Sequence, residues 1–201
     1  MINTERRNQI TEIAWQLWDD FLAYKSPAVR SRDLLTPSIR QPSVVSKEFF
    51  RFCVQVCTQQ GNAPPVDASI VRYDLSEANR AAQNRPASWL VMTFDARLER
   101  YPTIVIDYAT LYGRIAYFRT QQTINRLVLH ETGHVVLHWE QLQPNTRNGD
   151  LALAKSAVPF QEVEAWWFCL SIFGRVIAEV ADENARNPAN ADDQIWLDLN
   201  L

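Results

Sequence analysis

The sequence has few cysteines, few histidines and no long apolar run, and each shortage excludes a class of protein. Its 201 residues include three cysteines, an odd and sparse set that argues against a disulfide framework. No stretch reaches the roughly 18 apolar residues that a membrane span needs. The formal net charge of −3 implies no broad basic surface, so we expect no direct binding to nucleic acid or membrane. The charged residues 1–20 read as a helix rather than an export signal, so we expect a cytoplasmic protein.

What is present fits an ordinary globular chain of about one domain. Apolar residues make up 47% of the sequence and charged residues 21%. Apolar residues recurring at three- and four-residue spacing predict helices over 4–25, 47–59, 123–142 and 159–180. Three further segments read as strands, namely 69–73, 89–94 and 103–108.

Two segments are expected to lie outside these elements. Residues 27–46 carry three prolines and several serines, which predicts a long loop. The tail, residues 195–201, is apolar on alternate residues, so it is either a last strand or a segment that docks on a partner.

The strongest chemical signal is His130-Glu131-Thr132-Gly133-His134, an HExxH motif within a predicted helix. All three histidines of the chain lie between positions 130 and 138, which a random scattering would rarely produce. Because one helical turn is 3.6 residues, His130 and His134 project from the same face and can supply two ligands to a tetrahedral zinc ion. Glu131 beside them can hold a water molecule at the metal and accept its proton. The alternative is an amphipathic helix with two packed histidines.

Two neighbours of the histidine pair bear on the same site. Gly133 costs the helix about 1 kcal/mol relative to alanine, which makes sense if substrate or a neighbouring strand approaches closely. His138 continues the stripe, but three ligands along one straight helix span about 12 Å, too far to share one ion. A supporting or packing role is therefore expected for His138.

The third ligand must be a carboxylate or a cysteine, because no other histidine remains. Glu164 lies in a strongly apolar run, where an unpaired charge would be costly and a metal ion would supply a partner. The alternative is a glutamate in the first helical turn, favoured by the helix dipole. For Glu162 this alternative fits at least as well as a ligand role does. Cys169 and Asp150 are weaker candidates.

Cys53 and Cys57 lie four apart in a predicted helix and could face a metal together. Small buried residues on one helix face are the more common explanation of this spacing.

The motif region resembles the ImmA/IrrE-type metallopeptidases. Their motif reads roughly HELGHxxLH, and residues 130–138 depart from it only at Thr132, where leucine is usual. Their downstream helix carries a glutamate in an EAxxFA pattern, which Glu164 to Cys169 matches at all but the last residue. The similarity covers about residues 100–175. The usual apolar-proline ending is replaced by Ser171-Ile172-Phe173-Gly174.

This resemblance implies one zinc ion held by His130, His134 and Glu164, with Glu131 as general base. It also implies a zincin-like α+β fold, a mainly helical single domain with a small β-sheet beside the HExxH helix. Residues 1–46 would form an N-terminal helix and proline-containing loop, and residues 47–201 the zinc metallopeptidase-like domain, in one compact unit. Some members of the family cleave repressor proteins or act in stress responses.

The expected function is therefore zinc-dependent hydrolysis of a peptide bond in a protein or peptide substrate, with a regulatory protein as a further partner. Tyr108, Tyr112 and Tyr117 are candidate oxyanion helpers only because they precede the motif. The competing interpretation is a non-catalytic interaction or regulatory protein with a structural zinc. An intact Glu131 weighs against it, since a structural zinc needs no base. Hydrolysis of a non-peptide substrate would use the same chemistry.

Overall fold

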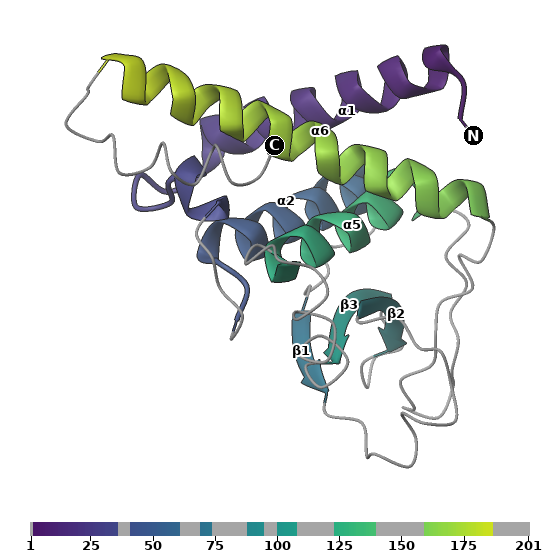
Figure 1. Cartoon of the computed structure of the whole chain (residues 1–201). Coiled ribbons are helices and arrows are strands. Elements are labelled where there is room, and N and C mark those ends of the chain that lie inside the picture. The colour runs from purple at the N-terminus through teal and green to yellow at the C-terminus, as the bar shows by residue number, and fades with distance from the viewer. Residues whose placement is uncertain are drawn as a thin grey trace.

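The computed structural model describes residues 2–35, 41–60, 69–73, 88–94, 100–107, 123–139 and 159–186. These residues are mostly helical and include one small sheet (Figure 1). The helices are α1 (Thr4–Tyr24), the short 3₁₀ helix η1 (Ser31–Leu34), α2 (Val44–Gln60), α5 (Thr123–His138) and α6 (Pro159–Arg186). The strands are β1 (Ser69–Tyr73), β2 (Ser88–Phe94) and β3 (Arg100–Asp107). The expectation of a mainly helical α+β fold is confirmed at this level.

Helix boundaries differ from the predictions where side chains cap or bury an end. Helix α2 begins three residues earlier than expected, because Ser43 accepts a hydrogen bond from the backbone N–H of Ser46 at 3.3 Å. Helix α6 continues to Arg186 rather than ending near residue 180. Val180 and Asn184, one turn apart, are both buried, so the inward face of α6 extends into a segment that looks polar in sequence.

The segment expected as a loop at 27–46 packs against the rest of the protein in its described residues, 27–35 and 41–46. It contains η1, and Val29, Leu34 and Leu35 are buried in the core. Asn125 at the start of α5 holds this region in place. Its amide donates to the Leu34 carbonyl at 2.8 Å, and its side-chain oxygen accepts from the Ser43 N–H at 2.9 Å and the Ser46 hydroxyl at 3.0 Å.

The sheet has β3 in the centre, in the order β1-β3-β2. β1 is parallel to β3, with Ser69 opposite Thr103, and β2 is antiparallel to β3, with Leu90 opposite Ile104. Ile104 and Ile106 of β3 are fully buried and pack with apolar residues of α2 and α5. The sheet therefore lies beside the motif helix, as expected.

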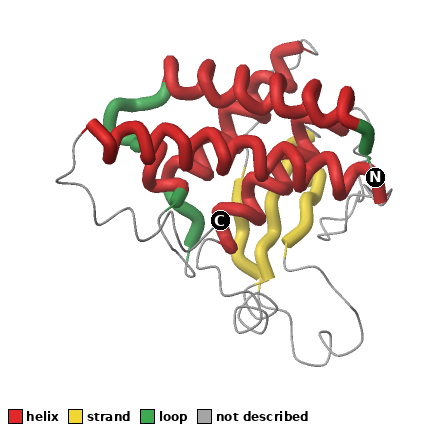
Figure 2. The backbone as a smooth tube through the Cα atoms, turned by 45° about the horizontal axis from the view of Figure 1, so that its top comes forward, coloured by secondary structure: helices red, strands yellow, loops and turns green. Residues whose placement is uncertain are grey.

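The helices form layers above this sheet. Helices α2 and α5 lie between the sheet and the pair α1 and α6 (Figure 1), and the tube view shows the same stacking (Figure 2). The larger core joins the four long helices around aromatic side chains, with Trp18, Phe49 and Phe168 each fully buried. Among the described helices, none has the length and apolar character needed to cross a membrane.

Helix α1 runs parallel to α6 and is joined to it along its length by polar contacts. Near their beginnings Arg6 pairs with Glu164 at 2.7 Å, and further along Asp19 pairs with Arg175 at 2.8 Å. The buried indole of Trp18 donates a hydrogen bond from Nε1 to the Glu179 carboxylate of α6 at 3.3 Å. The N-terminal helix thus shares a core with the motif helix and α6.

Candidate metal centre

Helix α5 places His130 and His134 together on the face that meets α6. Their side chains lie one turn apart, as the four-residue spacing predicted, with ring centroids 4.8 Å apart. Both residues are buried, His130 being 5% and His134 2% exposed. Leu129 and Val135 flank them in the two apolar cores, which fixes the rotation of α5 so that the imidazoles face α6.

Glu162, in the first turn of α6, completes this group. Its Oε2 lies 3.2 Å from His130 Nε2, and its Oε1 lies 3.3 Å from His134 Nε2. The Glu162 side chain is half exposed, so the group opens to solvent on the α6 side. With a proton on each Nε2, the imidazoles of His130 and His134 would donate hydrogen bonds to Glu162 and hold the pKa of its carboxyl far below the usual range.

The geometry of these three residues fits a metal ion. In a tetrahedral site with metal–ligand distances of about 2.1 Å, neighbouring ligand atoms lie about 3.4 Å apart. The two imidazole–carboxylate distances have nearly this value, and one ligand atom from each of the three residues lies within 4.8 Å of the others. Two imidazole nitrogens and one carboxylate form a donor set found in catalytic zinc sites, which keep a fourth position open. His130, His134 and Glu162 could therefore hold a metal ion.

The structure does not bring Glu164 to the histidine pair, although Glu164 was the preferred third ligand. Two residues along a helix correspond to about 200° of rotation, so Glu162 and Glu164 cannot face the same point. Glu164 instead pairs with Arg6, through contacts of 2.7 and 3.1 Å, and with His138 at 2.9 Å. Glu162 takes the position predicted for Glu164. The charge of the Glu164 carboxylate is compensated by the guanidinium of Arg6.

His138 has the supporting place expected of it. Its Nδ1 lies 3.4 Å from Nδ1 of His134, and its Nε2 lies 2.9 Å from Glu164. Burial lowers the pKa of His138, and the hydrogen bond to Glu164 opposes that shift. The hydrogen bonds from Arg6, followed by those from His138, lower the pKa of Glu164, which is therefore a carboxylate.

Two further residues adjoin the histidine pair, Glu131 along the chain and Trp166 in space. Glu131, the candidate base, is 4% exposed and lies on the same helical turn as His130 and His134. Trp166 covers one face of the His130 imidazole, with ring centroids 4.3 Å apart. Since Trp166 is 39% exposed, its indole forms a rim between His130 and solvent.

Gly133 allows α5 and α6 to approach closely at this point. A Cβ at position 133 would lie 3.0 Å from both the Cα and the carbonyl oxygen of Ala165, and 3.2 Å from Cβ of Phe168. The close neighbour is therefore α6, not substrate or a strand as the sequence suggested. This contact sets the distance at which Glu162 meets the histidines.

Cys53 and Cys169 are buried and Cys57 is partly buried, which agrees with the more common explanation of their spacing. Burial raises the pKa of Cys57 to about 11 and that of Cys169 to about 12, and it raises the pKa of Cys53 as well. Cys57 Sγ donates to the Val135 carbonyl at 3.8 Å, and Cys169 Sγ to the Arg126 carbonyl at 3.4 Å. Cys169 does not belong to the group of side chains that His130 and His134 form with Glu162. Asp150 and the three candidate tyrosines, at 108, 112 and 117, lie outside the described residues, as does the tail 195–201.

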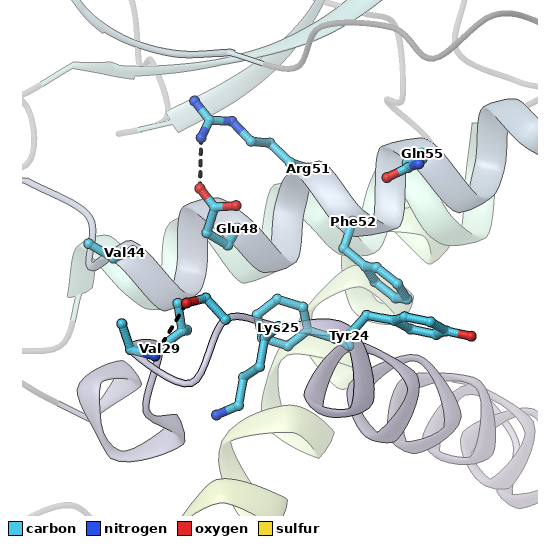
Figure 3. A pocket seen from close by; sticks show the side chains of 11 residues that line it. Tyr24, Lys25, Val29, Val44, Glu48, Arg51, Phe52 and Gln55 are labelled. Atoms are coloured by element: carbon cyan, nitrogen blue, oxygen red, sulfur yellow. Dashed lines mark hydrogen bonds and ion pairs between the residues drawn. The ribbon is translucent and has the colours of Figure 1, made fainter.

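A cavity of about 520 Å³ lies elsewhere, between the end of α1, the segment after it and α2 (Figure 3). Tyr24 and Phe52 stack along one side of it, and Glu48 on its α2 side accepts a hydrogen bond from Arg51 at 2.8 Å. The 11 residues that line it include no histidine or cysteine. The cavity has none of the metal or nucleophile chemistry of the motif.

No protein-family model, curated protein or solved structure matches the chain. Within the described ranges, His130, His134 and Glu162 are the one group of three or more His, Cys, Asp or Glu side chains placed to share an ion.

Proposed function

We propose that this protein is a zinc-dependent hydrolase that cleaves peptide bonds, with His130, His134 and Glu162 as metal ligands and Glu131 as general base. One observation carries the proposal: both histidine Nε2 atoms contact the same carboxylate, at 3.2 and 3.3 Å. The resemblance of residues 130–138 to the ImmA/IrrE-type motif supports it, and so does a small sheet beside the motif helix, as a zincin-like fold requires.

The chemistry follows from the placement of these groups. When bound, zinc supplies Lewis acidity, which makes water easier to deprotonate and polarises a scissile carbonyl. Glu131, on the helical turn between the two histidines, accepts the proton of the attacking water and returns it to the leaving amine. Glu131 is buried, so the proton transfer takes place away from bulk solvent.

The surface of α6 favours a peptide substrate over a small metabolite. Large apolar side chains are exposed on the half of α6 that carries Glu162, namely Phe160, Val163, Trp166 and Leu170. Exposed apolar side chains grouped beside a site suit the apolar side chains of a peptide. A Trp166→Ala variant is expected to raise KM for a peptide substrate more than it lowers kcat.

The first test is metal content after dialysis, by elemental analysis. About one zinc per chain is expected in the wild type. His134→Ala and Glu162→Ala should lose it, because each removes a ligand. Glu164→Ala is the matched control, because it removes a carboxylate two residues away and should still bind zinc, though more weakly. A wild type that takes up no zinc, or a Glu162→Ala protein that binds it as tightly as wild type, would overturn the ligand assignment.

The second test separates hydrolase from structural zinc protein. The wild type and Glu131→Gln, both zinc-loaded, are incubated with a proteome-derived peptide mixture, and cleavage is followed by mass spectrometry. Glu131→Gln should keep its zinc and lose about 10²- to 10⁴-fold in rate, the usual contribution of a general base. Equal cleavage by the two proteins would refute the role of Glu131. No cleavage by zinc-loaded wild type would favour the non-catalytic reading.

A further inference from the structure

A line of polar side chains runs from the candidate metal centre to the surface of the N-terminal helix. His134 Nδ1 lies 3.4 Å from His138 Nδ1, and His138 Nε2 lies 2.9 Å from Glu164 Oε2. Arg6 of α1 then holds both oxygens of Glu164, at 2.7 and 3.1 Å. The line thus joins α5, α6 and α1, which pack side by side (Figure 1).

The hydrogen-bonding capacities along this line fix where each proton lies. A carboxylate paired with a guanidinium can only accept, so Nε2 of His138 must donate to Glu164. A neutral His138 that donates from Nε2 has a bare Nδ1, which can only accept. Nδ1 of His134 must then carry the proton, which leaves Nε2 of His134 with a free lone pair.

The lone pair that results points toward Glu162. His134 Nε2 and Glu162 Oε1 are 3.3 Å apart, and both are acceptors in this arrangement. Two acceptors facing each other at this distance are compatible when a cation lies between them. The line of side chains therefore prepares His134 in the tautomer that a metal requires.

We propose that Arg6, Glu164 and His138 act as a positioning relay that fixes the metal-binding tautomer of His134, so that the N-terminal helix supports the metal centre. The relay builds on the proposed zinc site and assigns a role to α1, which matches no part of the family motif. Partners that orient a ligating histidine typically change metal affinity by about 10- to 100-fold when they are removed.

The first experiment measures zinc affinity by competition with a chromophoric chelator. Glu164→Leu, which breaks the relay in its middle, should weaken zinc binding by about 10- to 100-fold. Arg6→Gln should weaken it less, because His138 keeps its acceptor, and Arg6→Lys should recover part of the loss. Arg175→Gln is the matched control, because Arg175 also joins α6 to α1 through an ion pair, with Asp19. Equal affinities for wild type and Glu164→Leu would overturn the relay.

The second experiment reads the tautomer directly and needs no bound metal. Imidazole ¹⁵N spectra at pH 8 are simple to assign, because the chain has three histidines. In Glu162→Ala, which lacks the acceptor opposite Nε2, His134 should still carry its proton on Nδ1. Adding Glu164→Leu should shift the proton toward Nε2. An unchanged tautomer in the double variant would refute the relay. The expected shift in a protein whose wild type binds no zinc would support the relay and refute the zinc proposal.

Discussion

The two helical glycines described by the structure offer a matched test of the contact between α5 and α6. Replacing glycine by alanine within a helix stabilises it by about 1 kcal/mol, because alanine loses less backbone entropy on folding. At Gly174, in α6, an added Cβ meets nothing within 4 Å, so Gly174→Ala should increase the free energy of unfolding by about 1 kcal/mol.

At Gly133 the same gain is opposed by crowding. The added Cβ would lie 3.0 Å from two backbone atoms of Ala165, which cannot rotate away as a flexible side chain could. Overpacking of this kind costs about 1 to 3 kcal/mol. With about 2 kcal/mol against a helix gain of about 1, Gly133→Ala should destabilise the protein by about 1 kcal/mol. The two substitutions should therefore differ by about 2 kcal/mol.

Urea unfolding of both variants and wild type, with EDTA present, measures this difference without a metal contribution. For a chain of this size, 1 kcal/mol corresponds to about 2–4 °C in Tm, so the two variants should shift in opposite directions. Gly133→Ala should also weaken zinc binding, because it moves α6 and Glu162 away from the histidines, whereas Gly174→Ala should not. If Gly133→Ala raised the free energy of unfolding as much as Gly174→Ala, the close contact between Gly133 and Ala165 would be refuted.

Four other predictions concern the packing and burial of the described residues. Asn125→Ala should lower the free energy of unfolding by about 2–4 kcal/mol in urea unfolding, because it removes three hydrogen bonds of a buried amide; a loss below about 0.5 kcal/mol would contradict this. The buried thiols of Cys53 and Cys169 should react with a thiol reagent at pH 8 only after unfolding, and rapid labelling of either in the native protein would contradict this burial. Because burial raises the thiol pKa in the folded state, the unfolded chain loses protons first above about pH 9; stability should fall between about pH 9 and 11, and less so in Cys57→Ala. Phe168→Ala, which empties a fully buried site against Phe49, should cost about 3–5 kcal/mol, and a Tm within a degree of wild type would refute that packing.

The sequence by itself determined the features that depend on local spacing. The pairing of His130 with His134 follows from the pitch of one helix, whatever that helix packs against. The strand at 69–73 and the start of α5 at Thr123 also agree with the predictions, because apolar periodicity and turn residues are properties of short segments. The burial of Cys53 and Cys169 was anticipated from their small, apolar character.

The tertiary structure decided which side chain from another element meets the histidines. Glu162 and Glu164 lie on one helix, and the choice between them depends on the rotation of α6 about its axis. That rotation is set by Ala165 and Phe168 packing on Gly133. The same packing leaves Glu164 to Arg6, 158 residues away in sequence, which no local pattern could indicate. Local periodicity fixes which residues share a helix face, whereas the partner of that face is set by packing between distant segments.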